Sequence, residues 1–261
     1  AMMGVPTYYV RLLARSDFSA EATRNIRLFI SGSAPLLPAT HVQFLQRTGH
    51  RILERYGMTE TSMITTNPYH GERRAGTVGM ALDGVELRLA DPEHGGEMGL
   101  GEIGVIELRG PNVFSGYWNM PEKTAQAFRD DGYFITGDMG LVDADGYLKI
   151  VGRASDMIIS GGLNIYPKEV EAGIDQIDGV LESAVFGVPH PDFGEAVCAV
   201  VVLKNGVKLV EADIVAALRG VLAAFKQPKR VIFSCELPRN AMSKVQKGRL
   251  RADYAGLFDA S

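Results

Sequence analysis

Along the first 150 residues, hydrophobic positions follow the spacing of β-strands in some segments and that of α-helices in others. A β-rich run ending in small residues comes first, then a helical spacing, then a short strand. After residue 69, short strand-like runs are separated by glycine turns, with one helix that begins at proline. The predicted strands are 26–30, 51–55, 85–89, 105–109 and 148–151, and the predicted helices are 38–47 and 121–128.

From about residue 156 the pattern becomes that of a compact mixed unit. Strands and amphipathic helices follow one another closely here, without the glycine-rich texture of the preceding stretch. The predicted helices are 166–177, 211–224 and 245–254, and the predicted strands are 180–188, 196–203 and 230–235. We therefore expect an α/β and α+β protein with two domains, 1–154 and 155–261.

Composition narrows the class of protein. The chain is 46% hydrophobic and 22% charged, which is typical of globular proteins, and its formal net charge is −4. The longest apolar run, 196–203, is far shorter than a membrane-spanning helix, and the first residues do not resemble a secretory signal. Cys198 and Cys235 both lie in apolar, strand-like runs, which favours buried free thiols. We expect a cytoplasmic protein without a membrane partner.

Basic residues concentrate near the C-terminal end. Eight lysines and arginines between 226 and 251 face a single acid, Glu236. A solvated basic face and a site for a polyanionic ligand both explain this composition. Interleaved aromatic residues and nucleic-acid motifs are lacking, so we do not expect nucleic acid as a partner.

Two segments that follow predicted strands have the residues of a phosphate site. In 56–61 (YGMTET), glycine permits close backbone approach, threonine hydroxyls can donate to phosphate oxygens, and a carboxylate can hold Mg²⁺. In 31–36 (SGSAPL), small residues can form a flat wall against a planar ring. Taken alone, 56–61 is better explained as an ordinary polar turn after a strand, and 31–36 can also be a simple turn.

Three further segments suggest a nucleotide site. Asp138, in 136–138 (TGD), could accept hydrogen bonds from ribose hydroxyls or could cap a helix. The segment 152–156 (GRASD) leads into a glycine pair at 161–162. Lys244 lies in a polar loop before the last predicted helix, a position where most lysines are merely solvated.

In combination, the order and spacing of these segments closely resemble the adenylate-forming superfamily of acyl-CoA synthetases, luciferases and peptide-synthetase adenylation domains. The resemblance covers nearly the whole chain but only the C-terminal half of such an enzyme. Segments 4–9 (GVPTYY) and 54–79 most resemble the malonyl-CoA synthetases. Residues 1–154 would then be the C-terminal, β-rich part of the large domain, and 155–261 the small mobile domain.

The resemblance implies an acid–thiol ligase that uses ATP, Mg²⁺ and CoA, with a small carboxylate such as malonate as substrate. It also implies a role for each matching residue. The catalytic residues would be Lys244, Thr59 and Glu60, with Glu60 holding Mg²⁺. The nucleotide and acyl pocket would include Ser33, Ala34, Pro35, Tyr56 and Gly57, and the ribose would be bound by Asp138 and Arg153. The CoA channel would be lined by Gly161 and Gly162, with Phe193 and Phe225 against the CoA adenine.

The same family implies a rotation of the small domain about Ser155 between the two half-reactions. Phe193 and Phe225 match less closely than the other residues, and buried core phenylalanines are the alternative. The family's glycine-rich phosphate loop is absent from this sequence, so we expect weak adenylation by this chain alone. A ligase for another small or aryl carboxylate, and a non-catalytic fragment that binds nucleotide or CoA, remain alternatives.

Overall fold

A computed structural model describes residues 1–92, 94–240 and 244–258. The chain divides into two compact units, Ala1–Ile150 and Val151–Ser261, which we call unit 1 and unit 2. The division falls a few residues before the expected boundary after residue 154. The assignment of these units to the two domains of the family stays a prediction.

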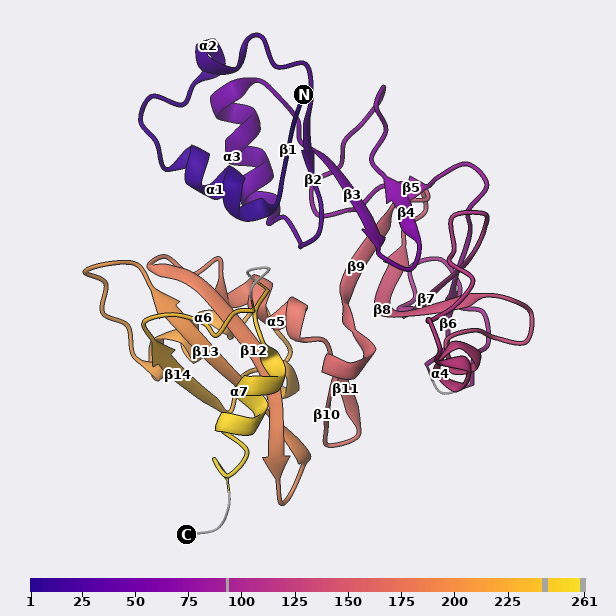
Figure 1. Cartoon of the computed structure of the whole chain (residues 1–261). Helices are drawn as coiled ribbons and strands as arrows, with labels where there is room; N and C mark the ends of the chain where they lie inside the picture. Colours follow the sequence, from indigo (N-terminus) through magenta and orange to yellow (C-terminus); the bar gives the residue numbers. More distant parts are fainter. Residues whose placement is uncertain (93, 241–243, 259–261) are drawn as a thin grey trace. The chain divides into compact units, whose positions relative to one another are not determined.

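The first sheet of unit 1 contains five strands in sequence order. Its first three strands run parallel, and the last two continue antiparallel (Figure 1). The parallel part places the ends of β2 and β3 at one edge, where functional loops collect in sheets of this kind. The strands are β1 Met2–Gly4, β2 Phe29–Ser31, β3 Leu53–Met58, β4 Ser62–Thr66 and β5 Met80–Ala81.

Helices α1 Pro6–Leu13, α2 Ala20–Thr23 and α3 Pro38–Thr48 accompany this sheet. The predicted helix over 38–47 corresponds to α3. It begins with proline at its first position and ends at Gly49 with φ 76°, a left-handed conformation that glycine adopts without strain. Aromatic rings from α1, β2 and α3 form a shared core, in which Tyr9, Phe29 and Phe44 are fully buried.

The second sheet of unit 1 has the order β6-β7-β8-β9, and its Ile106, Phe134 and Leu148 form one core with Tyr56 and Ile64 of the first sheet. Its strands are β6 Glu86–Ala90, β7 Gly104–Arg109, β8 Phe134–Val142 and β9 Leu148–Arg153, and the single helix α4 is Pro121–Gln126. The strands and helix predicted for this region are present, with ends shifted by one to a few residues.

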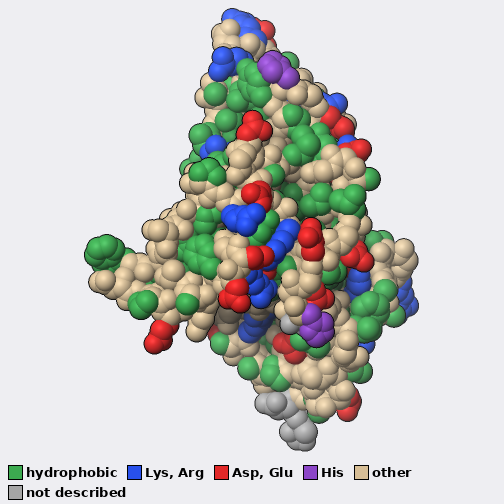
Figure 2. Space-filling view, turned by 90° about the vertical axis from the view of Figure 1, so that its right-hand side faces the viewer, with side chains coloured by type: hydrophobic (Ala, Val, Ile, Leu, Met, Phe, Trp, Pro, Cys, Tyr) green, Lys and Arg blue, Asp and Glu red, His purple; other side chains and the backbone are tan. Residues whose placement is uncertain are grey.

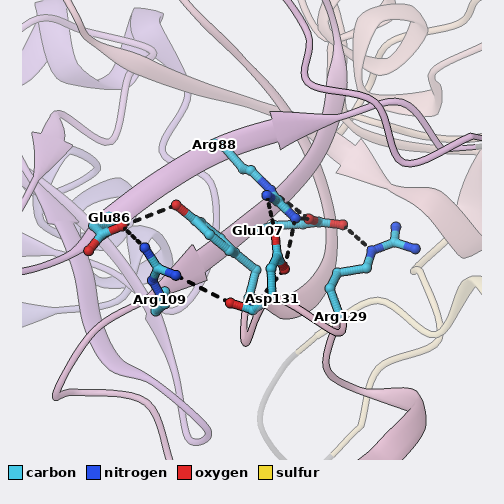
Figure 3. Close-up of polar contacts among 7 residues, drawn as sticks. Glu86, Arg88, Glu107, Arg109, Arg129 and Asp131 are labelled. Atoms are coloured by element: carbon cyan, nitrogen blue, oxygen red, sulfur yellow. Dashed lines mark hydrogen bonds and ion pairs between the residues drawn. The ribbon is translucent and has the colours of Figure 1, made fainter.

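An ion-pair network on the second sheet is centred on Glu107 (Figure 3). Glu107 on β7 is completely buried, and it accepts from Arg88 Nη2 at 2.9 Å and from Arg129 Nε at 2.8 Å. Arg88 also binds Asp131 at 2.6 Å. On the face seen in Figure 2, basic and acidic side chains likewise lie next to one another.

Unit 2 is a sheet covered by helices on both faces. The sheet order is β11-β10-β13-β12, and β14 pairs in parallel with β13. Alternate residues of β12 and β13 point to opposite faces of the sheet and form two separate cores. Helices α5 and α6 contribute to one core, and α7 contributes to the other. The strands are β10 Ile158–Ser160, β11 Leu163–Ile165, β12 Val180–His190, β13 Gly194–Leu203 and β14 Arg230–Ser234. The helices are η1 Ala154–Asp156, α5 Pro167–Ile174, α6 Glu211–Leu218, η2 Ala224–Lys226 and α7 Lys247–Asp253.

The two cysteines differ in environment. Cys198 on β13 is buried, as predicted, and burial raises the pKa of its thiol to about 12. Cys235 is exposed, because β14 ends at Ser234 and the chain leaves the sheet there. The prediction of two buried thiols is therefore wrong for Cys235. Both thiols are free. Within the described residues, no helix has the length and apolarity to cross a membrane.

Candidate functional site

Two of the predicted segments meet at one edge of the first sheet. Strands β2 and β3 are parallel neighbours, with Ser31 paired with Glu54 in the register. Ser33, Ala34 and Pro35 follow β2 and are exposed, and Thr59 and Glu60 form the turn that follows β3. The fold therefore brings these two loops to the same edge of the sheet, as a phosphate or nucleotide site requires.

Ser33 adopts a strained backbone conformation in the first of these loops. Its φ is 68°, in the left-handed region that costs a residue with a Cβ atom about 1 kcal/mol. Strain of this kind is tolerated chiefly where the surrounding structure or the function requires it. Ser33 thus places a hydroxyl at a position that glycine would occupy without strain.

A buried carboxylate fixes the end of the same loop, and the sequence analysis missed it. Glu54 on β3 is 4% exposed, and its Oε1 accepts a hydrogen bond from the Leu36 N–H at 3.2 Å. Burial raises the pKa of Glu54 to about 7, although the Leu36 N–H opposes the shift. Its Oε2 is buried and has no hydrogen-bond partner among the described residues. No polar pattern in the sequence distinguishes Glu54 from a surface glutamate.

The turn after β3 requires glycine at position 57. A Cβ atom on Gly57 would lie 2.1 Å from the carbonyl oxygen of Ser62, which is backbone and cannot move aside cheaply. The turn is also held from outside, because the Phe114 N–H donates to the Glu60 carbonyl at 2.8 Å and Asn112 Nδ2 donates to the Thr61 carbonyl at 2.8 Å. Thr59 and Glu60 are therefore presented on a fixed backbone.

Tyr56 and Asp138 lie far apart in sequence but are hydrogen-bonded. The Tyr56 hydroxyl donates to Asp138 Oδ2 at 2.6 Å, which joins β3 to β8. Both side chains are at least nine-tenths buried in this chain. Asp138 lies inside β8, so the alternative that it caps a helix is wrong. The two predicted nucleotide-site residues therefore form one polar pair between the two sheets of unit 1.

A small cavity of about 210 Å³ opens beside the Ser33 loop. Its polar lining includes Ser33 and Arg55, and its apolar lining comes from β1, the start of α1 and β4. Arg55 Nη2 lies 2.9 Å from Met3 Sδ, a weak acceptor. Within the described part of the chain, no carboxylate lies within ion-pair distance of Arg55. The cavity thus offers a hydroxyl and a guanidinium group to a small anion, and the sequence analysis had not singled out Arg55.

Glu60 is suited to hold a single metal ion together with phosphate. Its Oε1 accepts from the Tyr117 hydroxyl at 3.2 Å, and Thr59 lies beside it in the same turn. Burial, reinforced by the Glu60 charge, raises the pKa of Tyr117, so the tyrosine remains a donor. No cluster of three or more acidic, histidine or cysteine ligands occurs among the described residues. One carboxylate plus substrate phosphates is the donor set that Mg²⁺ commonly takes.

The glycine pair of unit 2 forms the tip of a β-hairpin. Gly161 and Gly162 have φ of 58° and 78°, as in the two-residue turns that join antiparallel strands, here β10 and β11. The Gly161 N–H donates to the Phe193 carbonyl at 2.9 Å, which brings two predicted CoA-site residues together. Their turn conformation gives a reason for glycine in addition to an open channel.

Phe193 and Phe225 are not core residues. Each is 39% exposed, and each has a lysine over its ring, Lys229 over Phe193 at 5.3 Å and Lys226 over Phe225 at 5.7 Å. The alternative that they are buried core phenylalanines is therefore wrong. An exposed ring beside a cation fits a nucleotide base and its phosphates, and the CoA role of both residues stays a prediction.

The basic run near the C-terminus is largely neutralised. Six of its eight cations pair with carboxylates, all of them from outside the run; these are Lys226, Arg230, Arg239, Lys247, Arg249 and Arg251. Among the described residues, Lys229 and Lys244 are the two members without a carboxylate at ion-pair distance. Lys244 and Arg153 are both exposed. The solvated basic face is thus largely a set of ion pairs. A site for a polyanionic ligand stays a prediction, and the exposed Lys244 is what the family resemblance requires.

The chain matches two family models, the AMP-binding enzyme over residues 1–118 and the AMP-binding enzyme C-terminal domain over residues 169–244. It is 41% identical over 267 residues to a malonate–CoA ligase of Arabidopsis thaliana, covering 95% of this chain and 43% of that protein. It is 39% identical over 255 residues to a feruloyl-CoA synthase of an Amycolatopsis species, covering 97% of this chain and 51% of that protein.

Solved structures show the same relationship. The ATP-bound crystal structure of MatB from Rhodopseudomonas palustris superposes with a TM-score of 0.96 at 57% identity, over 98% of this chain and 51% of that one. The mixed fold expected from the sequence is confirmed. The chain spans about half the length of the relatives it matches. It belongs to the adenylate-forming, AMP-binding family of enzymes, which includes the acyl-CoA ligases.

Proposed function

We propose that the protein containing this chain is an ATP-dependent acyl-CoA ligase that works through an acyl-adenylate. A carboxylate oxygen of the acid attacks the α-phosphorus of ATP and expels pyrophosphate. The CoA sulfur then attacks the acyl carbon and expels AMP. The family membership supports this reaction. The chain also carries Glu60, Asp138, Arg153 and Lys244 in the segments that resemble the family's motifs.

Each of these residues has one task in the proposal. Asp138 and Arg153 bind the ribose, and Tyr56 orients Asp138 through their hydrogen bond. Glu60 holds Mg²⁺, which when bound neutralises charge on the phosphates. Lys244 places a cation between the acid and the α-phosphate, where negative charge is redistributed during adenylation. Gly161 and Gly162, with Phe193 and Phe225, serve CoA.

We further propose that the acid is a small dicarboxylate of the size of malonate. The supporting observation is the 210 Å³ cavity in which Ser33 and Arg55 lie together. A distal carboxylate there would gain a hydroxyl donor and a bidentate guanidinium partner, which is strong recognition for this group. An aryl acid such as ferulate has no second carboxylate for these donors.

The experiment compares malonate with acetate in the full-length protein. Losing one hydrogen bond to a charged group costs about 1.5–3 kcal/mol, so Arg55→Met and Ser33→Gly should each lower kcat/KM for malonate by about 10- to 150-fold. Acetate, which lacks the distal carboxylate, should be affected little. Ser33→Gly should not disturb folding, because glycine adopts a φ of 68° without strain.

Arg51→Met serves as the matched control. Arg51 is an exposed arginine just before β3, the strand that carries Arg55, and it does not line the cavity. Equal losses with both acids would remove the dicarboxylate assignment while leaving the ligase assignment intact. A full-length protein that activates ferulate in preference to malonate would do the same.

A further inference from the structure

Lys244 lies on a hairpin whose base is closed by backbone hydrogen bonds. We call the arms 238–240 and 244–246 the Lys244 hairpin. The Asn240 N–H donates to the Lys244 carbonyl at 3.0 Å, and the Gln246 N–H donates to the Pro238 carbonyl at 2.8 Å. Helix α7 begins at Lys247, immediately after the second arm. The position of the Lys244 backbone therefore depends on the contacts that fix this base.

A buried glutamate on α5 fixes the second arm. Glu171 has a side chain only 3% exposed, and its Oε1 accepts from Lys247 Nζ at 2.6 Å. The same atom accepts from the Val185 N–H of β12 at 3.0 Å, while Oε2 binds Lys168 Nζ at 2.7 Å. Burial alone would disfavour the charged carboxylate, but the two lysines hold the pKa of Glu171 below its usual range. The ion pair is therefore charged.

This contact crosses the edge of the unit 2 sheet. Among the described strands, β12 pairs only with β13, so its other edge is open and the Val185 N–H there needs an acceptor. Helices α5 and α7 both pack against β12, but on opposite faces of the sheet (Figure 1). Glu171 thus joins one helix, the strand edge and the first turn of the other helix.

A second ion pair holds the first arm on the same strand. Arg239 Nη2 binds Glu182 Oε2, and Glu182 belongs to β12. Both arms of the Lys244 hairpin are therefore tied to β12, one directly and the other through Glu171 and Lys247. The two anchors differ in burial, since the Arg239 and Glu182 side chains are 37% and 32% exposed. The shielded Glu171–Lys247 pair is the stronger constraint.

We propose that Glu171, acting through Lys247, is a positioning residue for Lys244 in the adenylation step. This inference rests on the proposed function, in which Lys244 supplies the cation for adenylation. A flexible lysine side chain is effective only when its backbone is held in place, and a displacement of about 1 Å can cost about a hundredfold in rate.

The test is made on the full-length protein. It measures the two half-reactions separately and, in addition, the hydrogen exchange of the Lys244 hairpin. Lys247→Met and Glu171→Gln should slow adenylate formation about a hundredfold. Thioester formation from pre-made acyl-adenylate should change little. The amides of Asn240 and Gln246 should exchange faster, whereas Lys247→Arg should restore both the rate and the protection.

Arg249→Met is the matched control, because it removes a cation from the same helix at a side chain that is 66% exposed. If Lys247→Met behaves like Arg249→Met while Lys244→Ala blocks adenylation, the positioning role is overturned and the proposed function stands. If Lys247→Met lowers both half-reactions equally, its role is merely structural and the inference is again overturned. If Lys244→Ala leaves adenylation intact, the proposed function fails, and hydrogen exchange still decides whether Glu171 anchors the hairpin.

Discussion

Replacing Glu54 by glutamine should change how the stability of unit 1 depends on pH. The folded state raises the pKa of this carboxyl from 4.5 to about 7, mainly through burial. Between these two values the folded chain holds a proton that the unfolded chain has lost. The free energy of unfolding therefore falls as pH rises through this window, by about 1.4 kcal/mol per pH unit at most.

The size of the effect follows from the two pKa values. Between about pH 5 and about pH 8 the wild-type chain should lose roughly 2.5 kcal/mol through Glu54 alone. Glutamine keeps an oxygen to accept from the Leu36 N–H but cannot ionise. As pH rises through this window, the free energy of unfolding of the variant should therefore increase relative to that of the wild type by the same amount. Every other titrating group is present in both proteins, so their difference isolates Glu54.

Urea unfolding followed by hydrogen exchange of peptides covering 29–66 measures this in unit 1 alone. Such local detection matters because Asp175 in unit 2 also has its pKa raised by burial, to about 6. A difference between variant and wild type that stays constant over the whole pH range would refute the reasoning. It would mean that Glu54 ionises in the folded chain as readily as in the unfolded chain.

Two further substitutions test other parts of unit 1. Gly57→Ala should distort the turn after β3, since its Cβ would meet the Ser62 carbonyl at 2.1 Å, and the full-length protein should lose ATP binding measured by calorimetry; binding equal to wild type would contradict this account of the turn. Glu107→Gln should destabilise the second sheet by about 1.5–3 kcal/mol, because Arg88 and Arg129 would lose a charged acceptor while Arg88 keeps Asp131. Thermal unfolding of this chain checks it, and an unchanged midpoint would show that the network contributes nothing.

Strongly periodic elements were predictable from the sequence alone. The predicted helix over 38–47 and the predicted strand over 196–203 match α3 and β13 closely, because each has a long apolar face and clear end signals. The helix predicted over 211–224 is shorter. It ends at Leu218, where Arg219 is extended and Gly220 has a φ of 116°. The apolar residues beyond this point misled the periodicity argument.

Features that depend on distant parts of the chain were not predictable. Strand β1 has three residues and exists because it pairs with β2, more than twenty residues later. Arg55 gains its candidate role from a cavity lined partly by β1. Glu54 and Glu171 are glutamates whose burial only the fold reveals. Sequence motifs located the loops of the candidate site, whereas the residues that hold those loops required the structure.

The hydrogen bonds around the turn after β3 affect how such enzymes can be recombined. This turn is bound by Asn112 and Phe114 from a loop that follows β7, and Tyr56 beside it is bound to Asp138 on β8. Segments 54–62, 110–117 and 134–142 therefore form one exchangeable block, although long stretches of chain separate them. In a hybrid joined between residues 62 and 110, these hydrogen-bonded groups would come from two different parent proteins. Joints placed before 54 or after 142 would keep the block whole.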